Sequence, residues 1–285
     1  MASTGQDTNG HAATAGAVLS ELRDGVAWVT LNRPDVLNAM DEALMDGLLA
    51  ALEEAAADES VRCVAVRGAG RAFCAGGDLK MMARRREQAR LDGDSDGASL
   101  HRTAQELAHR GRASVLLQTM SKPTVAVLHG HVVGGAVGLA LGADVRIAAR
   151  GTSLRIGFAS IGLSGDYGLA YLLERSLGMA RARELVLLDP VLDADEALAM
   201  GLLTRVVEPE ELADAAAELA GRLAAGPTVA YARMKMNLLA AQAAHRLADV
   251  LPEEALNQRV SATTADAREA GRARAESRPP EFRGG

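Results

Sequence analysis

A glycine-bearing stretch in the middle of the chain constrains the fold more than any other. Residues 122–128 are apolar and β-branched and begin with a lysine and a proline, a pattern that predicts a buried strand. Residues 136–141 are small and apolar and predict a buried helix. Gly134 and Gly135 stand at the join, so the stretch predicts a strand, a glycine turn and a helix in succession.

This turn has two interpretations. Glycine lets a ligand approach the backbone closely, and the start of a helix presents free N–H groups at the positive end of its dipole. Such a place suits an anion, or an oxygen that becomes anionic during a reaction. Close packing of the helix on the strand accounts for the same glycines equally well, and this stretch alone leaves both interpretations open.

A second turn of the same kind lies earlier in the chain. Residues 61–67 predict a strand, and a turn that contains Ala75 and Gly76 follows it. Two N–H donors that converge on one carbonyl oxygen form an oxyanion hole, which stabilises an enolate or a tetrahedral oxyanion by roughly 3–4 kcal/mol per donor. Convergence of the two turns is a property of the fold that the sequence does not reveal.

The order of the predicted elements indicates an α/β fold. Short strands that lead into glycine recur at residues 64–66, 125–127 and 145–147, with helical stretches between them. We interpret this as a weak internal repeat of strand–strand–helix units, with a parallel sheet packed under helices. A hairpin is predicted at residues 18–31. Helices are predicted at residues 42–57, with Asp41 as the N-cap, and at 100–120, 169–177, 179–187, 194–200, 210–225, 229–243 and 252–278.

Composition and net charge argue against several classes of protein. Of the 285 residues, 48% are hydrophobic, enough to bury a large core. A net charge of −6 argues against a nucleic-acid partner, and no apolar run approaches the length that spans a membrane. Cys63 and Cys74 fit buried thiols in a reducing cytoplasm better than a disulfide framework, and no metal-ligand cluster is visible.

We expect three regions along the chain. Residues 1–17 lack the features of a signal peptide and are expected to be a disordered tail, residues 18–208 the core, and residues 209–285 a helical C-terminal region. The charged C-terminal helices cannot form much core alone and are expected to dock on the body or on another subunit. Residues 80–112 form a polar insertion, either a mobile flap over a site or a tolerated surface loop.

The chain resembles the crotonase family, the enoyl-CoA hydratase/isomerase superfamily, over about residues 18–284. The order and spacing of several weak motifs carry this resemblance. They are residues 31–40 (LNRPDVLNAM), 70–79 (GRAFCAGGDL), 130–135, Asp144, 178–185, 197–202 (ALAMGL) and 281–284.

The resemblance implies a spiral of ββα units, an α-helical C-terminal trimerisation region, and homotrimers or dimers of trimers. It implies an acyl-CoA substrate and no permanently bound cofactor. The N–H groups of Ala75 and Gly135 would hold the thioester oxygen. The residues expected to line the coenzyme A path are Val36, Asn38, Ala39, Ala75, Gly76, Gly77, Asp78 and Gly134. Family members often place an aromatic residue and a lysine near coenzyme A, where this chain has Arg274 and Ser277.

The resemblance stops short of the hydratase mechanism. Family hydratases add water with two glutamates, and the corresponding positions in this chain are Gly138 and Phe158. Neither side chain takes or gives a proton, which argues against simple hydration of a 2-enoyl-CoA.

Asp166 is the one acid in a suggestive place. Family members that move a double bond or rearrange a ring carry an aspartate there, and a carboxylate facing the acyl chain would remove a C–H proton and return it at another carbon. An aliphatic pocket would raise its pKa into a useful range. The competing interpretation is that Asp166 caps the helix that follows it.

We therefore predict an enoyl-CoA isomerase for double bonds or rings, with Asp166 as its base. The alternatives are a hydratase with non-standard catalysis, an acyl-CoA dehalogenase or hydrolase, and a non-catalytic acyl-CoA-binding protein. His129 and His131 flank Gly130, just before the glycine turn, but histidines at a strand end are more often hydrogen-bonded structural residues.

Overall fold

The computed structural model describes residues 16–91 and 97–285. The expected tail therefore falls almost entirely outside the described residues, as do residues 92–96 of the insertion. The other predicted elements lie within them.

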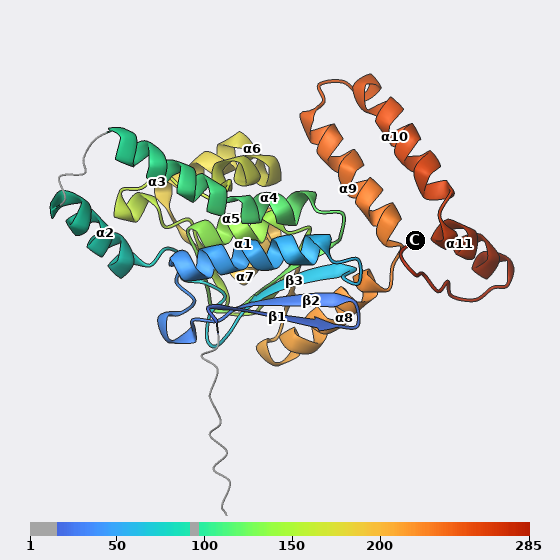
Figure 1. The fold of residues 1–285 in the computed structure, drawn as a ribbon, viewed down its shortest axis with the longest axis horizontal. Coiled ribbons are helices and arrows are strands. Elements are labelled where there is room, and N and C mark those ends of the chain that lie inside the picture. The colour runs from blue at the N-terminus through green and yellow to red at the C-terminus, as the bar shows by residue number, and fades with distance from the viewer. Residues whose placement is uncertain (1–15, 92–96) are drawn as a thin grey trace, which may run out of the picture.

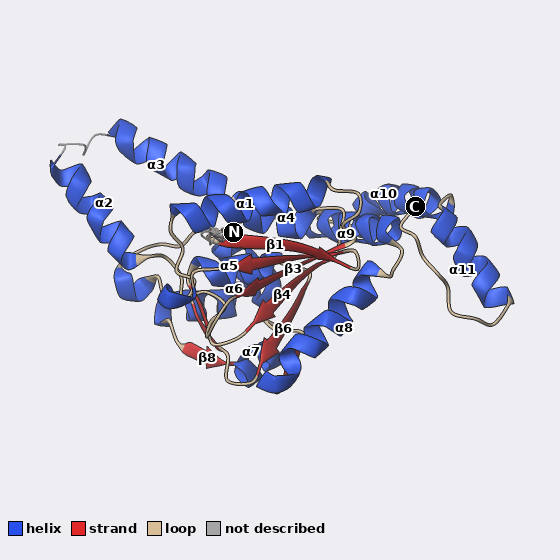
Figure 2. Ribbon diagram, turned by 60° about the horizontal axis from the view of Figure 1, so that its bottom comes forward, coloured by secondary structure: helices blue, strands red, loops and turns tan. Residues whose placement is uncertain are grey.

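A six-stranded sheet forms the centre of the molecule (Figure 2). Its strands lie in the order β1-β2-β3-β4-β6-β9, and the first pair is the predicted antiparallel hairpin, whereas every later pair is parallel. Three short strands form a second sheet in the order β5-β7-β8. The bounds are β1 Val18–Arg23, β2 Val26–Leu31, β3 Cys63–Gly68, β4 Thr124–Leu128, β5 His131–Val133, β6 Val145–Ala149, β7 Ser153–Arg155, β8 Val191–Asp193 and β9 Arg205–Val207.

Helices cover both faces of the large sheet. Alternate residues of a strand point to opposite faces, so Val64 and Val66 of β3 pack under α1, α4 and α5, while Cys63 and Ala65 pack against α8. Both cysteines are free and buried, as expected. The helices of the body are α1 Glu42–Ala57, α4 Arg112–Thr119, α5 Gly135–Gly142, α6 Leu169–Leu188, α7 Ala194–Met200 and α8 Leu212–Ala224, with 3-10 turns at Pro34–Val36, Ala159–Ile161 and Pro209–Glu211.

Local sequence signals set several helix boundaries. The Asp41 carboxylate accepts the Leu44 N–H and caps α1, as predicted. Gly178 has non-helical angles (φ 74°, ψ 160°) and divides α6 into the two predicted helices. The predicted helix over residues 100–120 is divided at Gly111. The expected start of the last helical segment at Pro252 is wrong, because this proline lies inside a helix that begins at Leu247.

Two helical extensions project from the body (Figure 1). The insertion forms α2 (Leu79–Leu91) and α3 (Gly97–Arg110) on one side. The C-terminal helices α9 (Thr228–Ala243), α10 (Leu247–Ala262) and α11 (Ala265–Ala275) form the other. Lys235 ties α9 to the body, because its ammonium group donates to Asp144 Oδ2 at 2.7 Å and to the Lys122 carbonyl at 3.0 Å.

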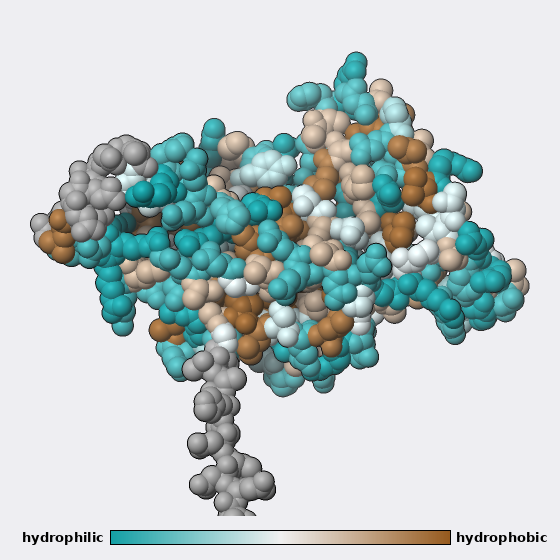
Figure 3. Space-filling model, viewed as in Figure 1, coloured by the Kyte–Doolittle hydropathy of each residue, from teal (hydrophilic) through white to brown (hydrophobic). Residues whose placement is uncertain are grey.

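The C-terminal extension exposes apolar side chains. Helix α9 has no buried residue, and Figure 3 shows apolar atoms gathered over α9 and α10. The large exposed side chains there are Met234, Met236, Leu238, Leu247, Leu251 and Leu256. No helix within the described residues is both long enough and apolar enough to cross a membrane.

Candidate active site

The two glycine turns meet in the folded chain. A short parallel pairing joins them, in which the Cys74 N–H donates to the His131 carbonyl at 3.0 Å and the Val133 N–H donates to the Cys74 carbonyl at 3.1 Å. A Cβ atom added to Gly134 would lie 3.8 Å from the Gly76 Cα atom. Parallel pairing therefore brings together two turns that lie about sixty residues apart in the sequence.

Gly135 supplies a free donor. It is the first residue of α5, so its N–H has no partner within the helix, and it makes no hydrogen bond elsewhere in the described chain. Gly134 before it has φ 64° and ψ −129°, a backbone conformation that side-chain-bearing residues avoid.

The predicted donor Ala75 is wrong. Its N–H donates to the Leu37 carbonyl at 2.9 Å, so this group is occupied. Two residues further on, Gly77 lies between the hydrogen bonds from Met40 N–H to the Gly76 carbonyl and from Asp78 N–H to the Met40 carbonyl. The Gly77 N–H itself makes no hydrogen bond within the described residues, and Gly77 lines the same cavity as Gly135.

Other residues predicted to line the coenzyme A path have structural roles. Asn38 is fully buried, and its amide donates to the carbonyls of Ala69, Ala72 and Phe73. The Asp78 carboxylate accepts the Met81 N–H and pairs with the Arg33 guanidinium group, and these contacts hold its pKa below the usual value.

Some of the predicted site residues line a cavity that lies over Gly77 and Gly135, and the others do not. Val36 and Ala39 are not among the residues that line the cavity, and neither are Ala75, Gly76 and Gly134. Only Gly77, Gly135 and Asp166 of the predicted site line it.

This cavity has a volume of about 730 Å³, and both Gly77 and Gly135 line it. It opens between the body and the insertion, so α2 and α3 form one wall and the loop before α6 forms another. No sequence pattern identified its methionines, which come from the start of α1, from the segment just before it and from α2. Its apolar lining residues include Met40, Met45, Met81, Met82, Leu100, Leu107, Phe158 and Tyr167.

Asp166 is the carboxylate of this cavity, and its side chain does not cap α6. The N-cap of that helix is Gly168, no side chain bonds to the helix start, and the Leu169 N–H uses the Asp166 backbone carbonyl. Asp166 Oδ1 is buried without a hydrogen-bond partner, and a Cβ on Gly135 would lie 2.7 Å from it. Burial raises the pKa of this carboxyl group to about 6.

The structure also accounts for the two positions where hydratases carry glutamate. A Cβ on Gly138 would lie 2.8 Å from the Tyr167 carbonyl oxygen, so Tyr167 fills the space that a larger side chain would need. Tyr167 is 3% exposed and has φ 52°, and sequence reasoning missed it. The Phe158 ring lies beside Gly134 and Gly165, where added Cβ atoms would approach it at 3.6 and 3.8 Å.

The two histidines beside the turn have structural partners. His129 Nε2 lies 3.0 Å from the Gly70 carbonyl oxygen, and His131 Nδ1 lies 2.9 Å from the Ser153 hydroxyl. Burial lowers the pKa of His129.

Comparisons with known proteins identify the family of this chain. The family model for enoyl-CoA hydratase/isomerase matches residues 21–285. The 1,2-epoxyphenylacetyl-CoA isomerase of Escherichia coli is 35% identical over 267 residues, 94% of this chain and 98% of that protein. The trans-2-decenoyl-[acyl-carrier-protein] isomerase of Streptococcus mutans is 34% identical over 94% of this chain and 98% of that protein.

A solved structure from Mycobacterium abscessus, described as an enoyl-CoA hydratase/isomerase, superimposes with a TM-score of 0.85 at 35% identity, covering 94% of this chain and 100% of that one. The chain therefore belongs to the enoyl-CoA hydratase/isomerase family and has the crotonase fold. It is an enzyme of the isomerase/hydratase type, and its family acts on coenzyme A thioesters.

Proposed function

We propose that this protein is an enoyl-CoA isomerase in which Asp166 transfers the proton and the N–H groups of Gly77 and Gly135 hold the thioester oxygen. The observation that carries the proposal is the buried Asp166 oxygen, which has no hydrogen-bond partner and lies beside Gly135. A carboxyl group with a pKa of about 6 is ionised at neutral pH yet basic enough to take a proton from carbon.

The proposed reaction starts from a 3-enoyl thioester. The Asp166 carboxylate removes a proton from C2, and the electron pair moves into the carbonyl to give a dienolate. Two N–H donors stabilise the negative oxygen, each by roughly 3–4 kcal/mol. Asp166 then returns the proton to C4, the double bond forms between C2 and C3, and the carboxylate is regenerated.

The test is conversion of 3-enoyl-CoA to 2-enoyl-CoA by the protein and by Asp166→Asn. General-base catalysis contributes about 10²–10⁴-fold, so we expect the variant to lose activity by that factor while acyl-CoA still binds. Deuterium exchange at C2 in heavy water checks the proton step separately. Hydration without isomerisation would contradict the proposal. Binding without exchange would indicate a non-catalytic acyl-CoA-binding protein.

We further propose that the exposed apolar side chains of α9 and α10 are covered by other copies of the chain, in a homotrimer or a dimer of trimers. Six large apolar side chains that face solvent on two adjacent helices are typical of an interface.

A further inference from the structure

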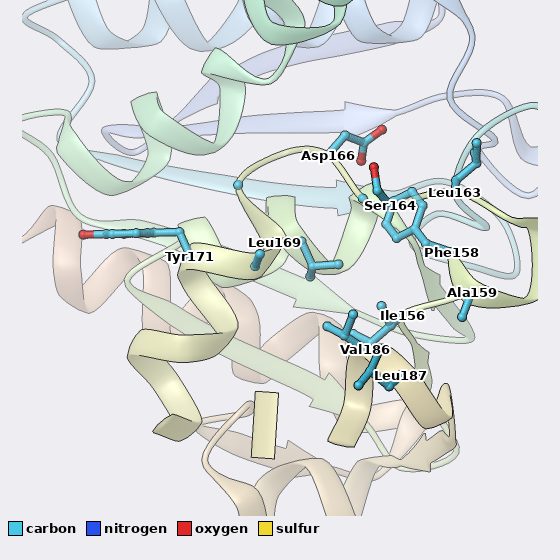
Figure 4. A pocket seen from close by; sticks show the side chains of 13 residues that line it. Ile156, Phe158, Ala159, Leu163, Ser164, Asp166, Leu169, Tyr171, Val186 and Leu187 are labelled. Carbon is cyan, nitrogen blue, oxygen red and sulfur yellow. The ribbon is translucent and has the colours of Figure 1, made fainter. Parts of the chain in front are cut away.

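A second cavity lies on the other side of the loop that carries Asp166. It has a volume of about 580 Å³ and is formed by this loop, the segment after β7 and the two halves of α6. Figure 4 shows the Asp166 carboxyl group and the Ser164 hydroxyl at one end, and the side chains of Ile156, Val186 and Leu187 at the other.

The two cavities share a wall. Phe158, Leu163, Ser164, Gly165 and Asp166 line both of them. Gly165 has no side chain, and a Cβ atom added to it would lie 3.8 Å from the Phe158 ring. At this point of the wall the Phe158 ring faces the Gly165 backbone, and rotation of the ring about its side-chain bonds would open a passage.

The lining of the second cavity selects its occupant. The described residues that line it include no Lys, Arg or His, and Asp166 is the only acid, so neither phosphate nor carboxylate finds a cationic partner. Ile156 and Leu169 are 6% and 3% exposed and form the buried part of its apolar lining, to which Val186 and the 72% exposed Leu187 also contribute. An uncharged hydrocarbon group fits such a lining.

We propose that the second cavity binds the distal part of a long acyl chain, whose thioester end occupies the first cavity and whose middle passes between Phe158 and Gly165. The inference rests on the proposed function, because that function sets the thioester at Gly77 and Gly135. It names the substrate class as acyl-CoA with a chain that extends well beyond the reacting carbons.

The physical consequence is a strong preference for chain length. Each buried methylene adds about fourfold in affinity, so a few methylenes in the second cavity separate long chains from short ones by more than tenfold. Phe158→Ala removes the ring from the passage, and we expect it to raise the affinity for long chains relative to short ones.

The test compares Ala170→Trp with the matched control Ala180→Trp. Both alanines are exposed residues of α6, but Ala170 lines the second cavity whereas Ala180 lines neither cavity. Calorimetry with lauroyl-CoA and butyryl-CoA gives the ratio of the two affinities. We expect Ala170→Trp to reduce this ratio about tenfold and Ala180→Trp to leave it unchanged.

Saturated ligands keep this test independent of the reaction. If lauroyl-CoA shows the expected ratio but 3-enoyl-CoA is not isomerised, the proposed function fails and the second cavity stands. An unchanged ratio in Ala170→Trp would overturn the inference. A changed oligomeric state in Ala170→Trp alone would also overturn it, because it would assign the cavity to a second copy of the chain.

Discussion

At the scale of single residues, the proposed chemistry depends on the burial of Asp166. Asp166 lies in a cavity whose lining is mostly apolar, its Oδ1 atom has no hydrogen-bond partner, and burial raises the pKa of its carboxyl group to about 6. An unpaired buried carboxylate destabilises the folded state, whereas a solvated one would be too weak a base to take a proton from carbon. Buried ionisable groups with strongly shifted pKa values are typical of functional sites.

Activity should rise with pH through the pKa of Asp166. The base works only when ionised, so kcat/KM for 3-enoyl-CoA is expected to be low at pH 5 and to level off above about pH 7. A pH–rate profile measures this directly. A profile that is flat between pH 5 and 8 would exclude Asp166 as the base.

The same pKa predicts a stability effect of opposite direction. Because the folded-state pKa lies above the unfolded value, the contribution of Asp166 to stability is complete below about pH 4 and is lost as the pH rises through about 6. Asp166→Asn should therefore be more stable than the wild type by about 3 kcal/mol at pH 8, and by little at pH 4. Urea unfolding at the two pH values checks this. Equal effects at both would contradict it.

At the scale of elements, the site depends on how turns are held. Asn38 adopts φ 56°, and its amide side chain binds three carbonyl groups of the segment that leads into the second glycine turn. The backbone carbonyl of the neighbouring Leu37 accepts a hydrogen bond from the Ala75 N–H. Together, the hydrogen bonds of Asn38 and Leu37 hold the turn that contains Gly77 in place.

Replacing Asn38 should disturb both stability and the donor at Gly77. Asn38→Ala leaves buried carbonyls unpaired, and we expect a loss of about 2–3 kcal/mol together with reduced kcat. Asn32→Ala is the matched control, because the Asn32 amide makes one exposed hydrogen bond, to the Gly16 carbonyl. Equal losses in the two variants, seen in denaturant unfolding, would refute the role of Asn38.

Helix α5 packs too closely on Tyr167 to carry a side chain at Gly138. A Cβ there would meet the Tyr167 carbonyl oxygen at 2.8 Å. Gly138→Glu should therefore lower the melting temperature and should not introduce hydratase activity. Gly221→Ala in α8 is the control, since nothing lies within 4 Å of its Cβ and alanine favours the helix. Hydration of a 2-enoyl-CoA by Gly138→Glu would disprove the packing argument.

At the scale of the whole molecule, the body and its two extensions have different roles. The sheet and its helices hold the glycine turns rigidly, and α2 and α3 complete the first cavity. The extension formed by α9 and α10 contributes no residue to either cavity and exposes its apolar side chains instead.

A charge on α9 should therefore disrupt assembly. Leu238 is 67% exposed, and burying a glutamate at that place in an interface is costly. We expect Leu238→Glu to shift the sedimentation coefficient from that of an oligomer towards that of a monomer. Leu22→Glu, at a 49% exposed leucine on the edge strand β1, should not. A monomeric wild-type protein would contradict the proposed assembly.

Most of the helices and strands, and the family, could be predicted from the sequence. Its glycines, caps and strand patterns are local signals, because turns, helix starts and buried strands depend on neighbouring residues. The same locality explains why the predicted donor Ala75 is wrong. Ala75 stands in the right motif, but the sequence does not say that the Leu37 carbonyl already occupies its N–H.

Only the tertiary structure decided which groups are free. Strand pairing between residues 74 and 132 brings the two turns together. The Leu37 carbonyl accepts the Ala75 N–H, so the N–H of Gly77 is the free donor of that turn. The fold likewise separated two roles that the sequence allowed for Asp166, because helix capping needs a side chain near free N–H groups and the loop turns this carboxylate into the cavity instead. Availability and burial are properties of contacts between distant residues, and these exist only in the folded chain.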